Sequence, residues 1–162
     1  MTWTRRSFIG GTAGVAAAMA TLGGWPVRAA EPMPFPRSKL TISSDRGNFV
    51  FTVEVANTWM QRRQGLQNRR TLPRDAGMLF DFRKPQLVSM WMKDTFLSLD
   101  MIFIDADEII FSIAENTELM SLDAIGSGAP VLAVLEVNAG TVARLGIRPG
   151  DRVHHPMFKV GK

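Results

Sequence analysis

The sequence predicts a single α+β domain in which antiparallel strands predominate and form a barrel-like sheet. The chain has 162 residues, a length that suits one domain. Short apolar segments, some with a period of two, recur along it and are separated by turns rich in Gly, Pro and Asp. Two stretches carry helix-capping signals. We therefore expect about seven short strands and two short helices.

The expected strands are alternating segments or apolar runs bounded by turn residues. In order, they are residues 39–43, 49–55, 77–82, 88–92, 97–104, 108–115, 130–137 and 152–154. Arg83-Lys84-Pro85 is expected to end the third. Ala106-Asp107 is expected to form a hairpin turn. The strand at 130–137 is apolar except for Glu136, and a buried carboxylate needs a partner.

Two short helices are expected from their capping residues. Asn57 and Gly65 would bound the first, and Asn138 and Gly146 the second. An arginine-rich segment includes and follows the first helix: Arg62, Arg63, Arg69, Arg70 and Arg74. It could bind an anion, but a solvated helix face and loop is the favoured interpretation, because charge commonly clusters on surfaces.

The N-terminus has the pattern of an export signal. Arg5 and Arg6 precede a small and two apolar residues, as in twin-arginine signals, and residues 10–25 are apolar. Cleavage is expected after Ala29; an uncleaved anchor is the alternative. The predicted divisions are the signal (1–29), an extended leader with the first short strand (30–47), a globular domain (48–154) and a C-terminal tail (155–162). These features predict a periplasmic or extracellular protein that meets the twin-arginine machinery and has no stable membrane insertion after cleavage.

Charge and cysteine content exclude several function classes. The formal charge is +4, but three of the 19 basic residues lie in the first 29, which leaves 16 basic against 15 acidic side chains. Such a near-neutral domain is not expected to bind nucleic acid. Without cysteine, disulfides, thiolate nucleophiles and cysteine-type zinc sites are excluded.

The candidate site lies at the polar corner between residues 88–92 and 97–104. An aromatic ring beside a few converging polar groups is typical of a small-molecule or peptide site. The candidate binding residues are Trp91, Lys93, Asp94, Asp100 and Glu136, with Arg69 and Arg70 at the rim. Lys93 is the expected partner of Glu136. The structural alternative is that Trp91 belongs to the core, Asp100 caps a turn and Lys93 pairs with Glu136 or Glu54 across the sheet.

A set of short motifs carries a family resemblance. They are, in order, Val53-Glu54-Val55-Ala56, Gly65-Leu66, Gly77-Met78-Leu79-Phe80, Trp91-Met92-Lys93-Asp94-Thr95, Leu99-Asp100-Met101-Ile102-Phe103-Ile104-Asp105, Leu135-Glu136-Val137-Asn138-Ala139-Gly140 and Gly146-Ile147-Arg148-Pro149-Gly150-Asp151. Together they resemble the domain of unknown function 192 family, small bacterial and archaeal proteins that are often exported. The resemblance implies a compact, mostly β fold and supplies no established activity, cofactor or catalytic residue.

We favour an exported binding or accessory protein, without cofactor or metal, over two alternatives. Asp100 and Glu136 could serve a hydrolase or lyase as an acid–base pair. However, the sequence contains no nucleophile elbow, phosphate loop or triad spacing, and no catalytic residue is assigned. The methionines and histidines of 90–92 and 154–157 could bind copper. Ten methionines in an apolar chain more often indicate packing.

Overall fold

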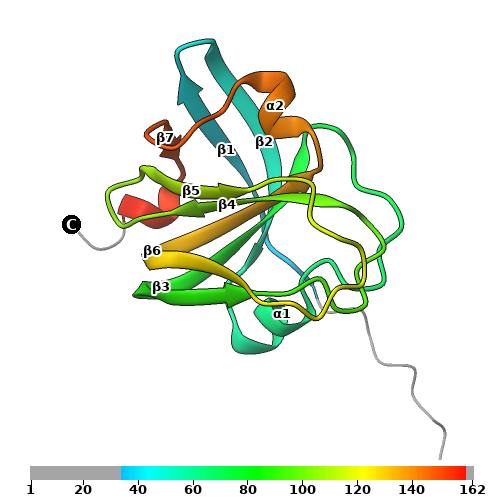
Figure 1. The fold of residues 1–162 in the computed structure, drawn as a ribbon. Helices are drawn as coiled ribbons and strands as arrows, with labels where there is room; N and C mark the ends of the chain where they lie inside the picture. Colours follow the sequence, from blue (N-terminus) through cyan, green and yellow to red (C-terminus); the bar gives the residue numbers. More distant parts are fainter. Residues whose placement is uncertain (1–33, 160–162) are drawn as a thin grey trace, which may run out of the picture. The chain divides into compact units, whose positions relative to one another are not determined.

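The computed structural model of the protein describes residues 34–159, which form seven strands and three short helices. The strands are β1 (Arg37–Ser44), β2 (Gly47–Ala56), β3 (Ala76–Met90), β4 (Leu99–Ile104), β5 (Ile110–Ala114), β6 (Ile125–Asn138) and β7 (Arg152–His154). The helices are α1 (Trp59–Gln64), α2 (Thr141–Leu145) and the 3₁₀ helix η1 (Pro156–Lys159). In Figure 1, α1 lies at the bottom of the view below β3, and α2 lies at the top.

The seven strands form one sheet whose two edges meet. The strand order is β5-β4-β6-β3-β2-β1-β7, and of these pairs only β2 and β3 run parallel. The edge strands β5 and β7 are joined by backbone hydrogen bonds: Ile110 N donates to Asp151 O (2.9 Å), and Val153 N donates to Glu108 O (2.7 Å). This contact is confined to one end of the two strands, so the sheet curls into a barrel-like shape without a continuous ladder between its edges. The predicted α+β fold with a barrel-like, mostly antiparallel sheet is confirmed.

The central strands β4, β6 and β3 bury both of their faces. One hydrophobic cluster receives residues from all seven strands and fills the inside of the curved sheet. A second cluster, which includes Phe80, Met101 and Val134, covers the outer face of these three strands. All six residues of β4 are therefore buried, and no polar alternation appears in this strand. Glu136 lies opposite Met101 and shares the outer face with it.

β3 and β6 are both much longer than expected, and β6 begins at Ile125 instead of residue 130. β3 does not end at Arg83-Lys84-Pro85 but passes through a bulge there, with a register shift between Asp81 and Gln86. Arg83 has a positive φ of 67°, and its N–H donates to the Asp81 carboxylate (2.7 Å). The Asp81 carboxylate thus accepts from the Arg83 N–H inside the bulge, where Pro85 has no N–H to continue the strand pairing. β3 ends at Met90, so the prediction of strand through Trp91 and Met92 is wrong.

Both helices end at the predicted glycines but begin at other residues. Thr58, not Asn57, caps α1, because its hydroxyl and the Gln61 side chain form a reciprocal capping box. Gly140 occupies the cap position of α2 in the left-handed conformation, with no side-chain cap. Asn138 instead donates its amide to Leu72 O (3.0 Å), in the connection that leads to β3.

The described domain extends beyond the expected boundaries at both ends. β1 pairs with β2 and β7 and is therefore part of the sheet. The segment expected to be a tail packs onto the domain, since Phe158 is buried in the inner cluster. The predicted signal and its cleavage site lie outside the described residues. Within residues 34–159, no helix has the length and apolar character needed to cross a membrane.

Candidate functional site

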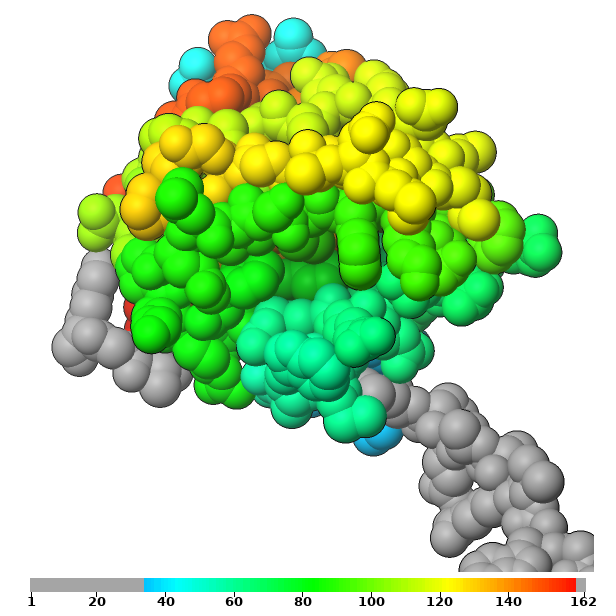
Figure 2. Space-filling view, turned by 60° about the horizontal axis from the view of Figure 1, so that its bottom comes forward, coloured from blue at the N-terminus to red at the C-terminus, as the bar shows by residue number. Residues whose placement is uncertain are grey.

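A cavity of about 240 Å³ opens between α1 and the segment that follows β3. Figure 2 looks onto this face and shows the hollow between the teal region of α1 and the green region of β3. Two indole rings, three cationic side chains, two side-chain amides and one carboxyl group line it. The lining residues include Trp59, Arg62, Arg63, Gln64, Gln67, Phe80, Phe82, Met90, Trp91, Lys93, Thr95 and Glu136.

Helix α1 forms one wall of the cavity. The side chain of Gln61 anchors the helix, because it accepts from Asn57 N and Thr58 N and donates to Pro34 O. Arg62 is held by Asp81 O (2.8 Å) and lies over the ring of Phe82. Arg63 lies over the Trp59 indole, 5.3 Å from its centroid. Both guanidinium groups therefore have aromatic or backbone partners at the edge of the cavity.

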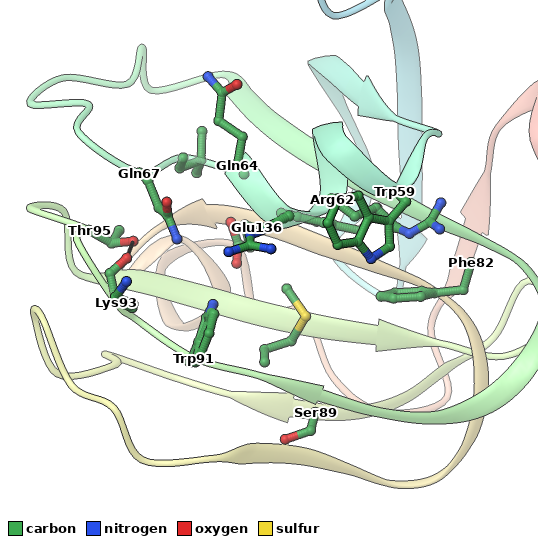
Figure 3. Close-up of a pocket in the computed structure, with 15 residues that line it drawn as sticks. Trp59, Arg62, Gln64, Gln67, Phe82, Ser89, Trp91, Lys93, Thr95 and Glu136 are labelled. Atoms are coloured by element: carbon green, nitrogen blue, oxygen red, sulfur yellow. Dashed lines mark hydrogen bonds between the residues drawn. The ribbon is translucent and has the colours of Figure 1, made fainter. Parts of the chain in front are cut away.

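The opposite wall is the Trp91–Thr95 arm. Met92 is fully buried and anchors the arm: its N–H donates to Ser121 O (3.1 Å), and its sulfur accepts from Thr117 Oγ1 (3.3 Å). Trp91 and Lys93, on either side of Met92, line the cavity and are half-exposed. Thr95 closes the turn by donating its hydroxyl to Lys93 O (3.2 Å), the bond drawn in Figure 3.

Glu136 is the single carboxyl group among the lining residues. It is 4% exposed and makes no hydrogen bond or ion pair with any residue of 34–159. No fully buried side-chain oxygen in this part of the chain lacks a partner, so the Glu136 oxygens reach the cavity. Figure 3 shows this side chain in the middle of the ring of labelled residues. Burial raises the pKa of Glu136 to about 8, because the charged form is poorly solvated there.

The predicted ion pair between Lys93 and Glu136 is wrong. Both residues line the cavity, but the Lys93 ammonium lies 3.5 Å from the Asp94 carboxylate instead. Lys93 is half-exposed, and its ammonium loses less solvation beside an exposed acid than it would beside a buried one. Glu136 is left with its proton instead of a counter-ion.

Asp100 does not line the cavity. It faces Val137 on β6, so its side chain points to the inner face of the sheet, opposite to Glu136. It is fully buried and accepts from Asn116 N (3.0 Å) and Val142 N (2.9 Å). Asp100 therefore caps backbone N–H groups, as the structural alternative in the sequence analysis expected, and does not line a binding site. The two carboxyl groups cannot face one substrate, so the acid–base pair of the hydrolase alternative is not present.

The remaining predicted residues also lie away from the lining. Arg69 pairs with Glu54 and lies over Phe35. Burial alone would raise the pKa of Glu54, but hydrogen bonds and charge from Arg69 and Arg37 outweigh burial and hold this pKa below its usual value. Arg70 lies over the ring of Phe96, 4.6 Å from its centroid. Asp94 contacts the cavity only indirectly, through Lys93.

Sequence reasoning missed the contribution of α1 to the cavity. Trp59, Arg62, Gln64 and Gln67 come from a segment about thirty residues before Trp91, and nothing local links the two. One signal was present: Trp59 and Arg63 are spaced by one helical turn and do share a face. The exposure of Trp59, at 64%, marks that face as a surface feature.

The methionines and histidines proposed as copper ligands do not converge on one point in the described residues. Met90 lines the cavity, whereas Met92 is buried beside Thr117. His154 contacts Ser43 (3.0 Å), and His155 contacts Ser38 (2.6 Å). Within residues 34–159, no three His, Cys, Asp or Glu side chains are placed to hold one metal ion.

The Ser38–His155 contact does not form a catalytic dyad. His155 Nδ1 accepts from Met157 N (3.2 Å), so the neutral ring carries its proton on Nε2 and donates to Ser38 Oγ. Burial lowers the pKa of His155, while the charge of Asp81 opposes this effect. A ring that already donates to the serine cannot take its proton.

The fold and the cavity together define a small, barrel-like β-rich domain with a cavity on its outer face. The chain belongs to the DUF192 family, described as "Uncharacterized ACR", whose model matches residues 41–155. This result confirms the resemblance.

Two solved structures show the same fold. A "putative transcription regulator" from Sinorhizobium meliloti 1021 is 45% identical, with a TM-score of 0.74, over 76% of this chain and 96% of that chain. A protein of unknown function from Novosphingobium aromaticivorans DSM 12444 is 36% identical, with a TM-score of 0.72, over 74% of this chain and 85% of that chain. No curated protein matches the chain.

Proposed function

We propose that this protein is an exported binding protein that holds a small organic molecule in the cavity between α1 and the Trp91–Thr95 arm. The observation that carries the proposal is the buried Glu136 carboxyl, which has no partner among the described residues and opens into a cavity flanked by two indoles. Buried polar groups in folded proteins are normally paired. A carboxyl group that opens into a largely apolar cavity is the kind of placed polar group that orients a ligand in a binding site.

Binding is favoured over catalysis by what lines the cavity. Glu136 has no second carboxyl group, histidine or cysteine beside it among the lining residues. Common hydrolases combine two such groups, or one of them with an activated nucleophile. A lone carboxyl group suits recognition.

The export part of the proposal is supported by the N-terminal sequence pattern. Arg5 and Arg6, followed by the apolar segment and the Val27-Arg28-Ala29 site, have the arrangement of a cleavable twin-arginine signal. The Sinorhizobium relative is described as a "putative transcription regulator". The near balance of 16 basic and 15 acidic side chains beyond residue 29 does not favour that role.

Tryptophan fluorescence tests binding directly. The chain has four Trp and no Tyr. After cleavage at Ala29 only Trp59 and Trp91 remain, and both line the cavity. We expect a pool of small periplasmic metabolites to change the emission of the processed protein and to raise its melting temperature.

A matched pair of variants locates the site. Trp91→Ala should remove the thermal shift, because it removes one wall of the cavity. Phe111→Ala changes an exposed aromatic residue outside the lining and should leave the shift intact. No response from any metabolite fraction, or an equal loss in both variants, would contradict the proposal.

A further inference from the structure

The acidic group of the cavity lies at its floor, and the cationic groups lie on its walls. Glu136 is 4% exposed and lies on the floor formed by β6. The charged side chains that line the cavity from all surrounding elements are Arg62 and Arg63 of α1, Lys93 of the arm, and Glu136 itself. The lining thus has one acid on its floor and three cations on its walls.

None of the three cations is directed to the acid. Arg62 is bound to Asp81 O, Arg63 lies over Trp59, and Lys93 lies beside Asp94. A buried carboxyl group without a cation of its own is completed best by a positive group that arrives with the ligand. The half-exposed Trp91 indole, which unlike Trp59 has no arginine over its ring among the described residues, favours an ammonium group through its π-electrons.

A simple amine does not satisfy the whole cavity. Its charge would pass three cationic side chains on the way to Glu136. A simple organic acid would suit those cations but would give the ionised form of Glu136 no counter-ion. A molecule with an ammonium group at one end and an acidic group at the other satisfies both parts of the lining.

The size of the cavity limits the ligand further. Drug-sized ligands occupy pockets of roughly 300–1,000 Å³. At about 240 Å³, this cavity suits a molecule of amino-acid size.

We infer that the cavity recognises a small zwitterion of amino-acid size, with its ammonium group at the Glu136 carboxylate and its acidic group at Lys93 or Arg63. This inference rests on the proposed function and names the class of its ligand.

Binding of such a ligand has a proton signature. Glu136 carries a proton near neutral pH because burial raises its pKa to about 8. An ammonium group stabilises the ionised carboxylate, so the proton leaves as the ligand binds. At pH 6.5, calorimetric titration in two buffers of different ionisation enthalpy should therefore show release of roughly one proton per bound ligand.

The test begins with calorimetric titration of the processed protein with each of the twenty amino acids and glycine betaine. The amino acid that binds most tightly is then compared with two analogues, one without the amine and one without the carboxylate. We expect loss of the amine to weaken binding by about tenfold or more. We expect Lys93→Gln to weaken binding of the zwitterion more than binding of the analogue without the carboxylate.

Glu136→Gln is the matched variant, because it keeps the shape and removes the charge. It should weaken binding by about tenfold or more and abolish proton release. If this variant does not fold, proton release from the unaltered protein still tests whether a buried carboxyl group ionises when the ligand binds.

Three results separate the two proposals. Equal affinity for the analogue without the amine, or binding without proton release, overturns the inference. Response to other metabolites but to no zwitterion overturns the inference and leaves the proposed function standing. Response to no compound overturns both.

Discussion

The buried carboxyl group of Glu136 reduces the stability of the fold when it is ionised, and it is also the central group of the candidate site. This carboxyl group is buried on the outer face of β6, and no cation among the described residues compensates it. Burial therefore raises its pKa from the ordinary value of 4.5 to about 8. In the folded protein the carboxyl group binds its proton more tightly than in the unfolded chain, so ionisation favours unfolding.

Glu136→Gln should therefore stabilise the protein at alkaline pH. Between pH 4.5 and about 8 the folded state holds a proton that the unfolded chain has lost. This group alone then lowers the free energy of unfolding by up to about 1.4 kcal/mol per pH unit as pH rises. The glutamine variant should lack this component, which urea denaturation at pH 5, 6, 7 and 8 measures. If the free energies of unfolding of the two proteins changed with pH in parallel, burial would not be raising the pKa of Glu136.

Asp100 illustrates the opposite use of a buried carboxylate. Its two oxygens accept from Asn116 N and from Val142 N at the start of α2, so it ties a loop and a helix to β4. Both hydrogen bonds are made to a charged acceptor, which strengthens them.

Asp100→Asn should destabilise the protein by about 2–3 kcal/mol, because its NH₂ group would face a backbone N–H that needs an acceptor. Asp94→Asn is the matched control, since the Asp94 side chain is half-exposed and pairs with the half-exposed Lys93. The control should change the free energy of unfolding by less than about 1 kcal/mol in urea denaturation. Equal effects of the two substitutions would show that Asp100 is not the stabilising group.

At the scale of elements, β3 and β6 form the longest pairing in the sheet, and it supports the cavity floor. Gly77 on β3 lies opposite Val137 on β6. A Cβ atom at Gly77 would lie 2.6 Å from the backbone oxygen of Glu136, too close for a real contact. The absence of a side chain at Gly77 therefore permits the close approach that positions Glu136.

Gly77→Ala should separate β3 from β6 locally and cost on the order of 1–3 kcal/mol of stability. Gly126→Ala on β6 provides the control, because a Cβ atom there meets nothing within 4 Å. In thermal unfolding, the melting temperature of Gly77→Ala should be lower than that of the unaltered protein. The melting temperature of Gly126→Ala should stay within about a degree or two of it. An unaltered melting temperature in Gly77→Ala would contradict the close packing.

At the scale of the whole described domain, the two edges of the sheet meet near one end of β5 and β7. Bonds between β5 and the segment around β7 bring residues about forty positions apart into contact, and Phe158 of η1 packs into the inner cluster beneath. Contacts of such long sequence separation form only in the complete fold.

Amide hydrogen exchange tests this closure. The N–H groups of Ile110 and Val153 donate across it and should exchange only when the sheet opens. We expect them to exchange at least about a hundredfold more slowly than those of Leu119 and Leu122, which lie in the exposed loop before β6. Exchange at loop rates would show that the two edges are not joined.

The local chemistry of the sequence determined the class of the fold and pointed to part of the candidate site. Alternating and apolar segments between turns predicted the strands, and Gly65 and Gly146 predicted where the helices end. The corner after the fourth predicted strand identified Trp91 and Lys93, and the one acid of an apolar strand identified Glu136. All three line the cavity.

Only the tertiary structure decided which side chains face each other. Neighbouring residues of a strand point to opposite faces, so the face of each acid depends on the pairing register, which local sequence does not reveal. That register separates Asp100 from Glu136, and the docking of α1 adds Trp59 and Arg62. Lys93 pairs with Asp94 and not with Glu136, because solvation and distance, which are properties of the folded molecule, govern ion pairing.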